Sequence, residues 1–361
     1  MDSVWAKAGL PAPGMPLGLL EVREWASIIA IVLVLWLLGI ILWSATPHQG
    51  IRQIPHVSIR HTLLSTIRGE SHAQFYQCHI KQRLEKYGMV RVYFTGRWLV
   101  YVSDPQYIYD FFYNPDTFDR PNPSSLLTGS PLRYFFGNGI LAAYGKVCHI
   151  RSGAGLFRPR VVALDQRLLT LEILGIEIFG IDFEHVQTAA RQEVLSVIPS
   201  SAGFEQLTDE TLNQLQYGHA VIKESMRYEP VLSVLTNRHL RHDYHVGTIV
   251  LPKGTKMGVH VYGVHHNPQL WDQPDVFKPE RFLTEAGRSD RALGWIPFAA
   301  GTHQCIGMQF AMRQIRIIFA LLLYHYEWSL PVGSIHADQL QTTLGPVTSV
   351  RNLFLHFRKR A

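Results

Sequence analysis

The sequence predicts a mainly α-helical globular fold with small β-sheets, carried behind an N-terminal membrane-spanning helix. Apolar residues recur at helical spacing through Thr170–Phe179, Asp209–Tyr228 and Met308–Tyr326, and only a few short segments between the helical ones are strand-like. An uninterrupted apolar run near the N-terminus is a separate signal. With 361 residues, 47% of them hydrophobic, the chain has enough apolar material for one large core.

The N-terminal apolar run is WASIIAIVLVLWLLGIILWSA, residues 25–45, and it contains no charged side chain. A helix needs roughly 20 such residues to cross a bilayer core, and tryptophans near both ends are typical of membrane interfaces. A cleaved signal peptide is the alternative, but its apolar region is shorter and a small-residue cleavage site would follow it. We expect a tail at 1–24, a single-pass anchor at 25–45, a linker at 46–60 and one globular domain at 61–361.

Two short strand pairs are expected in the globular domain. Val90–Phe94 and Trp98–Val102 flank Thr95-Gly96-Arg97, which predicts a β-hairpin. A second pair is expected within Gly247–Val259, around the turn residues Pro252-Lys253-Gly254.

The charge and cysteine content exclude some classes of protein. The formal net charge is +6, but the basic residues are scattered, which argues against nucleic-acid binding and is compatible with an anionic membrane or an acidic protein partner. Cys78, Cys148 and Cys305 are an odd and widely spaced set, which favours a reducing compartment over a disulfide framework.

Cys305 stands in FAAGTHQCIG, residues 298–307, just before the expected helix at Met308. That run becomes apolar on every face in its second half, which is typical of a buried helix. At a helix start, the unpaired N–H groups and the helix dipole favour the thiolate, the form that binds metals. Gly301 and Gly307 permit unusual backbone angles and close approach of a flat ligand. The alternative is that Cys305 is simply a small buried apolar residue.

A second motif pairs acidic and basic residues. Glu224 and Arg227, in KESMR, lie three residues apart and therefore on one helix face. Arg281 follows in Pro279-Glu280-Arg281-Phe282. Taken alone, the helical pair would be read as a solvated surface ion pair of little energetic weight.

Together, these motifs resemble those of the cytochrome P-450 family, in its eukaryotic, microsomal form and of fungal type. The spacing of Phe298, Gly301, His303, Cys305 and Gly307 is similar to the family's haem-binding loop. The resemblance implies haem b as cofactor, with Cys305 as the axial ligand of the iron. It also implies that Glu224, Arg227 and Arg281 form the family's buried Glu-Arg-Arg network, in which every charge must be matched.

Three further positions are assigned through the same resemblance. Arg238, in TNRHLRHD, and His303 would bind the haem carboxylates, although each could instead be a surface cation. GKVCHIR resembles the helix that carries Trp-x-x-x-Arg in the family; Arg151 is retained, but Val147 replaces the tryptophan. A zinc site at His239, His242 and His245 is disfavoured, because spacing of three in an extended segment scatters the imidazoles over different faces.

The resemblance runs in two blocks that abut near residues 184–186. The family's substrate-covering region and central helix stand between these blocks, and an Ala/Gly-Gly-x-Asp/Glu-Thr pattern is absent from the sequence. The sequence therefore predicts an internally truncated form, which could reflect a shortened splice form, a gene-model error or a degenerate copy.

The expected function is a haem-thiolate monooxygenase, anchored in the endoplasmic reticulum membrane with its catalytic domain in the cytosol. The resemblance implies electrons from NADPH-cytochrome reductase, and a small apolar substrate of specialised metabolism. A haem-thiolate isomerase or dehydratase that needs no reductase is one alternative, and an inactive truncated remnant is another. No catalytic residue beyond the haem ligand is identified.

Overall fold

The structure, a computed structural model, divides into two compact units: Met1–His48 with Phe94–Trp98, and Gln49–Tyr93 with Leu99–Ala361. It describes residues 27, 29–32, 46–47, 49–94, 97–119, 183–198, 207–284, 293–301, 304–337, 340–345 and 347–360. In the first unit, residues 29–32 are helical and exposed. Most of the expected anchor at 25–45 lies outside the described residues, and within the described ranges no helix combines the length and hydropathy needed to cross a membrane.

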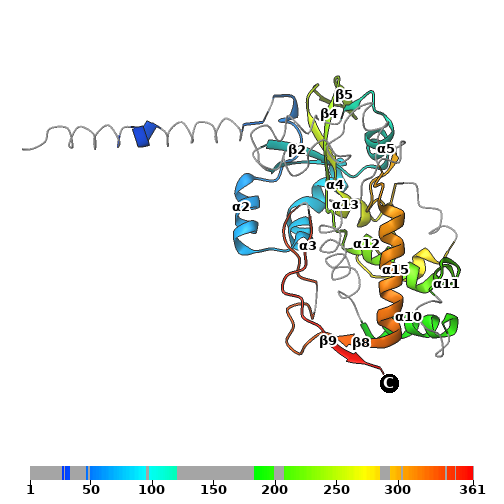
Figure 1. Ribbon diagram of the computed structural model, residues 1–361. Coiled ribbons are helices and arrows are strands. Elements are labelled where there is room, and N and C mark those ends of the chain that lie inside the picture. Colours follow the sequence, from blue (N-terminus) through cyan, green and yellow to red (C-terminus); the bar gives the residue numbers. More distant parts are fainter. Residues whose placement is uncertain are drawn as a thin grey trace, which may run out of the picture. The chain divides into compact units, whose positions relative to one another are not determined.

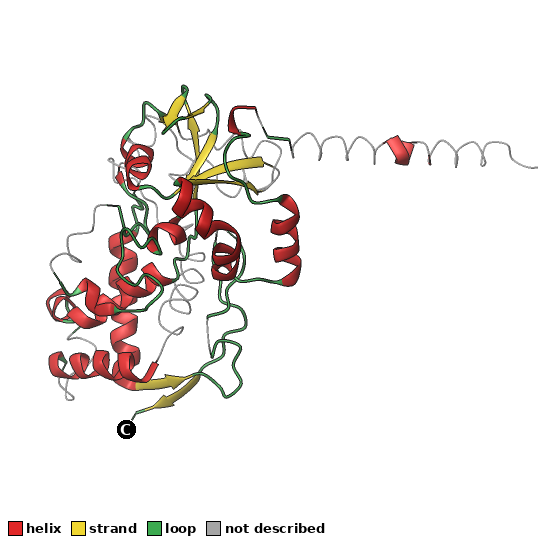
Figure 2. Cartoon of the chain, turned by 180° about the vertical axis from the view of Figure 1, so that it is seen from behind, coloured by secondary structure: helices red, strands yellow, loops and turns green. Residues whose placement is uncertain are grey.

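The second unit combines helices with small sheets, as the sequence predicts. One sheet has five strands in the order β1-β2-β7-β4-β3, shown among the yellow arrows of Figure 2. Its central strand β7 pairs in parallel with β2 and antiparallel with β4. The strands are β1 (Met89–Phe94), β2 (Arg97–Val102), β3 (Phe118–Asp119), β4 (Leu235–Leu240) and β7 (Lys256–Val259).

The first expected hairpin corresponds to β1 and β2, which are neighbours in this sheet. The prediction of a second hairpin around Pro252-Lys253-Gly254 is wrong. The hairpin instead joins β5 (Tyr244–Val246) to β6 (Ile249–Leu251), with Gly247 at φ 59° in the two-residue turn. The turn at Pro252 returns the chain to the five-stranded sheet, where the Gly254 N–H bonds to the Leu240 carbonyl (2.8 Å).

Three helices pack together around one apolar core cluster: α10 (Phe183–Val197), α12 (Gln216–Tyr228) and α15 (Met308–His325). Figure 1 shows α10 and α12 beside α15, and all three pairs are in contact. The single helix expected over Asp209–Tyr228 is two helices, because Leu215 has ψ 71° and ends α11 (Asp209–Gln214). The helix expected at Thr170–Phe179 lies outside the described residues.

The remaining elements are mostly short. The helix α5 (Pro105–Tyr113) begins at Asp104, whose carboxylate accepts a hydrogen bond from the Gln106 N–H. The others are η1 (Gln49–Ile51), α2 (Ile59–Arg68), α3 (His72–Phe75), the π-helix η2 (Tyr76–Ile80), α4 (Lys81–Tyr87), α13 (Val261–His265), η5 (Pro279–Phe282), β8 (Tyr326–Ser329) and β9 (His356–Lys359).

Candidate functional site

The structure brings Glu224, Arg227 and Arg281 together in the interior. The side chains of Glu224 and Arg227, one turn apart on α12, are 0% exposed. Arg227 donates two hydrogen bonds to the Glu224 carboxylate, from Nε to Oε2 (2.7 Å) and from Nη2 to Oε1 (2.9 Å). Arg281, on η5, adds a third from its Nε to Oε1 (3.1 Å). Burial excludes the alternative of a solvated surface pair.

Backbone groups complete the coordination of these charges. The Arg227 Nη1 donates to the carbonyls of His265 and Pro274, both at 2.8 Å. Arg281 donates to carbonyls of the same connecting segment, including that of Val276 at 3.0 Å. Because one carboxylate faces two guanidinium groups, these carbonyl dipoles help to stabilise the excess positive charge. The network thereby fastens residues 272–278 to α12.

His265 connects this network to the segment before Cys305, and sequence reasoning missed it. Its Nε2 accepts a hydrogen bond from the Ile296 N–H (3.0 Å), so the proton lies on Nδ1, which faces the Arg227 carbonyl at 3.2 Å. Burial lowers the pKa of His265 to about 3, which keeps the ring neutral. The single sequence holds no signal for this role, because His265 and Ile296 meet only in the folded chain.

The loop before α15 is held by its own backbone. The Cys305 N–H donates to the Phe298 carbonyl (2.9 Å), which closes the loop. Gly301 has φ 67°, and a Cβ there would lie 2.7 Å from the Phe112 carbonyl oxygen. Glycine is therefore required at position 301, both for its backbone angle and for close packing of the loop on α5. At Gly307, φ is −86° and a Cβ would lie 3.8 Å from the Cys305 sulfur, so no such restriction applies.

Cys305 is a free, exposed thiol immediately before α15. The apolar second half of α15 enters the core, as expected, with Phe319 and Leu323 buried. The start of the helix does not, because Phe310 and the preceding Ile306 are 59% and 60% exposed. Only one stripe of α15, which includes Ile315 and Phe319, enters the core, because α10 and α12 cover one side of it. The sulfur thus stands at a helix N-terminus among exposed apolar side chains. The alternative of a small buried core residue does not hold.

Arg238 lies on β4 and is 6% exposed, so it is not a surface cation. Its guanidinium carbon lies 4.8 Å from the centroid of the Phe111 ring on α5. The next residue of that helix, Phe112, contacts Gly301. Adjacent residues of α5 therefore contact both Arg238 and the loop before Cys305.

Other expected site residues are placed differently or lie beyond the described ranges. His303, Val147 and Arg151 fall outside the described residues. His239 lies on β4 and His245 on β5, with His242 in the exposed turn between them. Over the part of the chain that the structure describes, no three His, Cys, Asp or Glu side chains are grouped to hold a metal ion.

Comparison with known proteins shows what the segment that carries this geometry is similar to. A sequence model described as "Cytochrome P450" matches residues 182–353, so this part of the chain is similar to that family. Members of the family use haem, whose iron is bound axially by a cysteine thiolate. The matched segment includes Glu224, Arg281 and Cys305.

Curated relatives support the same assignment. "Probable cytochrome P450 4p3" of Drosophila melanogaster is 37% identical over 32% of this chain and 22% of its own length. "Cytochrome P450 4A10" of Rattus norvegicus is 37% identical over 40% of this chain and 27% of its own. "3-hydroxyindolin-2-one monooxygenase" of Zea mays is 31% identical over 47% and 32%. The matches thus span at most about a third of these relatives. A cytochrome P450 crystal structure aligns with a TM-score of 0.48 and 25% identity, covering 56% of this chain and 44% of that one.

The described residues fit a haem-thiolate site in their chemistry. Cys305 offers an accessible sulfur at a helix start. Ile306, just before α15, and Phe310, in its first turn, are exposed apolar side chains available to contact a flat apolar ligand. The Arg238 guanidinium, which packs on the Phe111 ring, is a group that can bind a carboxylate.

Proposed function

We propose that this chain is a haem-thiolate monooxygenase in which Cys305 is the axial ligand of haem b. The observation that carries the proposal is the exposed Cys305 thiol at the start of α15, within the segment that the cytochrome P450 model matches. When bound, haem supplies the oxygen chemistry, and a thiolate ligand favours O–O cleavage. The chain itself supplies the sulfur and the shape of the loop.

The other residues position this loop or bind the edge of the cofactor. The Phe298 carbonyl accepts a hydrogen bond from the Cys305 N–H, and Gly301 shapes the turn with its positive φ. Arg238, with His303 and Arg151, would bind the haem carboxylates. The network of Glu224, Arg227 and Arg281 would act indirectly, by holding the backbone of His265 in place. The His265 ring in turn accepts a hydrogen bond from Ile296, in the segment before Cys305.

The proposed partners and location rest on the resemblance to the family and on the N-terminal sequence. We propose a single-pass anchor at 25–45 in the endoplasmic reticulum membrane, a cytosolic catalytic domain, and NADPH-cytochrome reductase as electron donor. The substrate would be small and apolar, such as an intermediate of specialised metabolism. Two similar proteins are named for the oxygenation of one organic compound, "Tabersonine 3-oxygenase" of Catharanthus roseus and the Zea mays monooxygenase already described.

We also propose that the chain is an internally shortened member of the family. The family match begins at residue 182, close to the junction at 184–186 where the two blocks of sequence abut. Reading the genomic sequence around the codons for Glu184 and His185 tests this: an omitted coding segment for the central helix is expected there.

A haem-thiolate isomerase or dehydratase is the second candidate. The observation that favours it is the absence from the sequence of the acid-alcohol pattern that would handle protons during O₂ cleavage. Turnover that requires NADPH and a reductase supports the monooxygenase, whereas peroxide rearrangement without either supports the isomerase.

The decisive experiment is a spectrum of the full chain, purified after haem supplementation, then reduced and treated with CO. A thiolate-ligated haem gives the long-wavelength absorption band of this family. Cys305→Ala should remove that band, while the matched variant Cys78→Ala, also an exposed cysteine, should retain it. Colourless wild-type protein would identify an inactive remnant, and a band that survives in Cys305→Ala would show that another residue binds the iron.

A further inference from the structure

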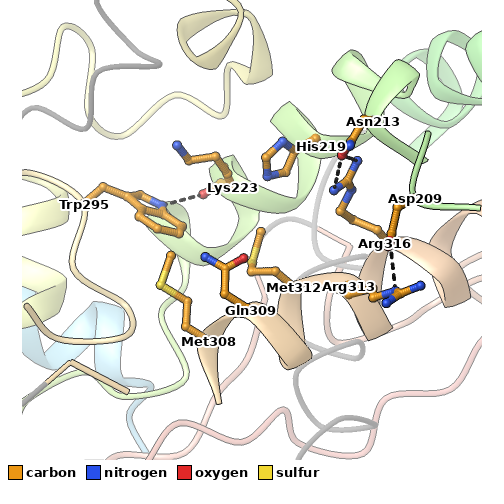
Figure 3. Close-up of a pocket in the computed structure, with 10 residues that line it drawn as sticks. All are labelled: Asp209, Asn213, His219, Lys223, Trp295, Met308, Gln309, Met312, Arg313 and Arg316. Carbon is orange, nitrogen blue, oxygen red and sulfur yellow. Dashed lines mark hydrogen bonds and ion pairs between the residues drawn. The ribbon is translucent and has the colours of Figure 1, made fainter. Parts of the chain in front are cut away.

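A pocket lies beside α12 and α15, and the proposed haem chemistry gives it no role. Its volume is about 570 Å³, within the range of about 300–1,000 Å³ typical of small-molecule sites. Figure 3 shows Lys223 on the α12 side of the pocket and Met308, Gln309 and Met312 on the α15 side. Trp295 closes one end and donates its indole N–H to the Lys223 carbonyl (3.0 Å).

The floor of the pocket is apolar and recessed. Trp295 and Met312 are 9% and 8% exposed, and Met308 is partly buried beside them. Methionine side chains are flexible and polarizable, and they make favourable contacts with flat aromatic groups. A ligand with a flat apolar body would therefore find both shape and contact area here.

The polar groups around this floor are mainly cationic. The charged residues of the lining are Lys223, Arg313, Arg316 and Asp209, so their formal charge balance is three minus one, or +2. Asp209 pairs with Arg313 at 3.0 Å, but both side chains are more than half exposed, so this pair is weak. Arg316 is engaged by Asn213. The Lys223 ammonium lies over the rings of Trp295 (4.8 Å) and Phe282 (4.9 Å), at the apolar end.

We propose that this pocket binds a small amphipathic anion, with a flat apolar body on Met308, Met312 and Trp295 and one carboxylate or phosphate at Lys223. Asp209 disfavours a polyanion, because a second negative charge would approach its carboxylate. An acidic protein surface fits less well, because it would reach the exposed Arg313 but not the recessed floor. The site needs no haem, so its occupancy can be measured separately from the proposed function.

Naphthalene-2-carboxylate is a suitable probe, and 2-naphthylmethanol is its uncharged counterpart. In calorimetric titrations of the full chain, we expect the carboxylate to bind about tenfold more tightly than the alcohol. Lys223→Met should weaken carboxylate binding about tenfold and leave the alcohol unaffected, because it removes the charge but keeps an apolar stem. Lys253→Met, which removes an exposed lysine elsewhere, should bind like the wild type.

A second variant guards against misfolding as the cause of any loss. Gln309 is exposed and points into the pocket, so Gln309→Glu adds a negative charge without disturbing the core. It should also weaken binding of the carboxylate, with an unchanged circular dichroism spectrum. Equal affinities for the two probes, or undiminished carboxylate binding in both pocket variants, would overturn the proposal. Binding of a glutamate-rich peptide in place of the carboxylate would make this face a protein-docking surface and would also overturn it.

Discussion

The Glu224 carboxylate and the Cys305 thiol lie in opposite environments, although the same family match contains both. Glu224 is 0% exposed and receives hydrogen bonds from two arginines and the Lys278 N–H. Cys305 is exposed, and a hydrogen bond from its backbone N–H to the Phe298 carbonyl holds its backbone in place. The chain supplies every partner of Glu224 by folding. The Cys305 sulfur, in contrast, lies at the surface of the described chain.

This difference predicts that the two residues fail in different ways when they are substituted. A change at Glu224 should be felt as lost stability, since it leaves buried cations without their counter-ion. A change at Cys305 should be felt as lost chemistry with little change in stability, since exposed side chains contribute little to folding. The predictions below test this contrast.

The largest effect is expected for Glu224→Gln. It leaves Arg227, which is 0% exposed, beside Arg281 without the carboxylate, and should lower the free energy of unfolding by about 3–5 kcal/mol. Urea denaturation followed by circular dichroism measures this. The matched change Asp209→Asn breaks the exposed pair with Arg313 and should cost less than about 1 kcal/mol. Similar losses in the two variants would show that burial does not separate these ion pairs.

His72→Phe should reduce the sensitivity of the fold to acid. His72 is 4% exposed, neither ring nitrogen has a hydrogen-bond partner within the described chain, and burial lowers its pKa to about 4 from an ordinary 6.5. As the pH falls, the unfolded chain binds a proton at this histidine before the folded chain does. The stability that the neutral ring contributes is therefore complete above about pH 6.5 and is lost as the pH falls toward 4. Between pH 7 and pH 5, the free energy of unfolding of His72→Phe should therefore fall by about 2 kcal/mol less than that of the wild type.

Urea denaturation at pH 7 and pH 5 measures this difference. The buried rings of His260 and His265, whose pKa values are also lowered by burial, should leave the variant with part of its acid sensitivity. His245→Phe, at an exposed position, should behave like the wild type. If His72→Phe loses as much stability on acidification as the wild type, water reaches the ring in the folded protein.

Glu193→Gln should have a smaller effect. The Glu193 carboxylate, on α10, accepts hydrogen bonds from the backbone N–H groups of Tyr217 (2.7 Å) and Gly218 (2.8 Å). These two groups lie in the first turn of α12, where backbone N–H groups have no acceptor within the helix. The amide loses one acceptor and the favourable charge at the helix N-terminus, so we expect a loss of about 1–2 kcal/mol. The urea midpoint of this variant should fall below that of Glu85→Gln, an exposed control on α4. Coinciding midpoints would mean that water replaces the carboxylate without cost.

The smallest effect on folding is expected for Cys305→Ser. Measured without added haem, its free energy of unfolding should lie within about 0.5 kcal/mol of the wild type, because the side chain is exposed. The same variant should lose the long-wavelength CO band completely. A large loss of stability in Cys305→Ser would assign the sulfur a structural role and remove the contrast with Glu224.

The sequence by itself determined the features that depend on neighbours along the chain. Helical spacing predicted α15 almost to the residue, Met308–His325 against an expected Met308–Tyr326, because the periodicity of apolar residues is a local property. Glu224 and Arg227 were placed on one face for the same reason. The position of Cys305 before a helix was likewise evident from the order of residues.

Only the tertiary structure decided which distant segments meet. It paired β7 with β2 and β4 instead of β6, joined His265 to Ile296, and placed Lys223 over Trp295. It also left Phe310, an apolar side chain near the start of α15, exposed. Burial and pairing depend on what packs against each segment from elsewhere in the chain, and local periodicity does not contain that information.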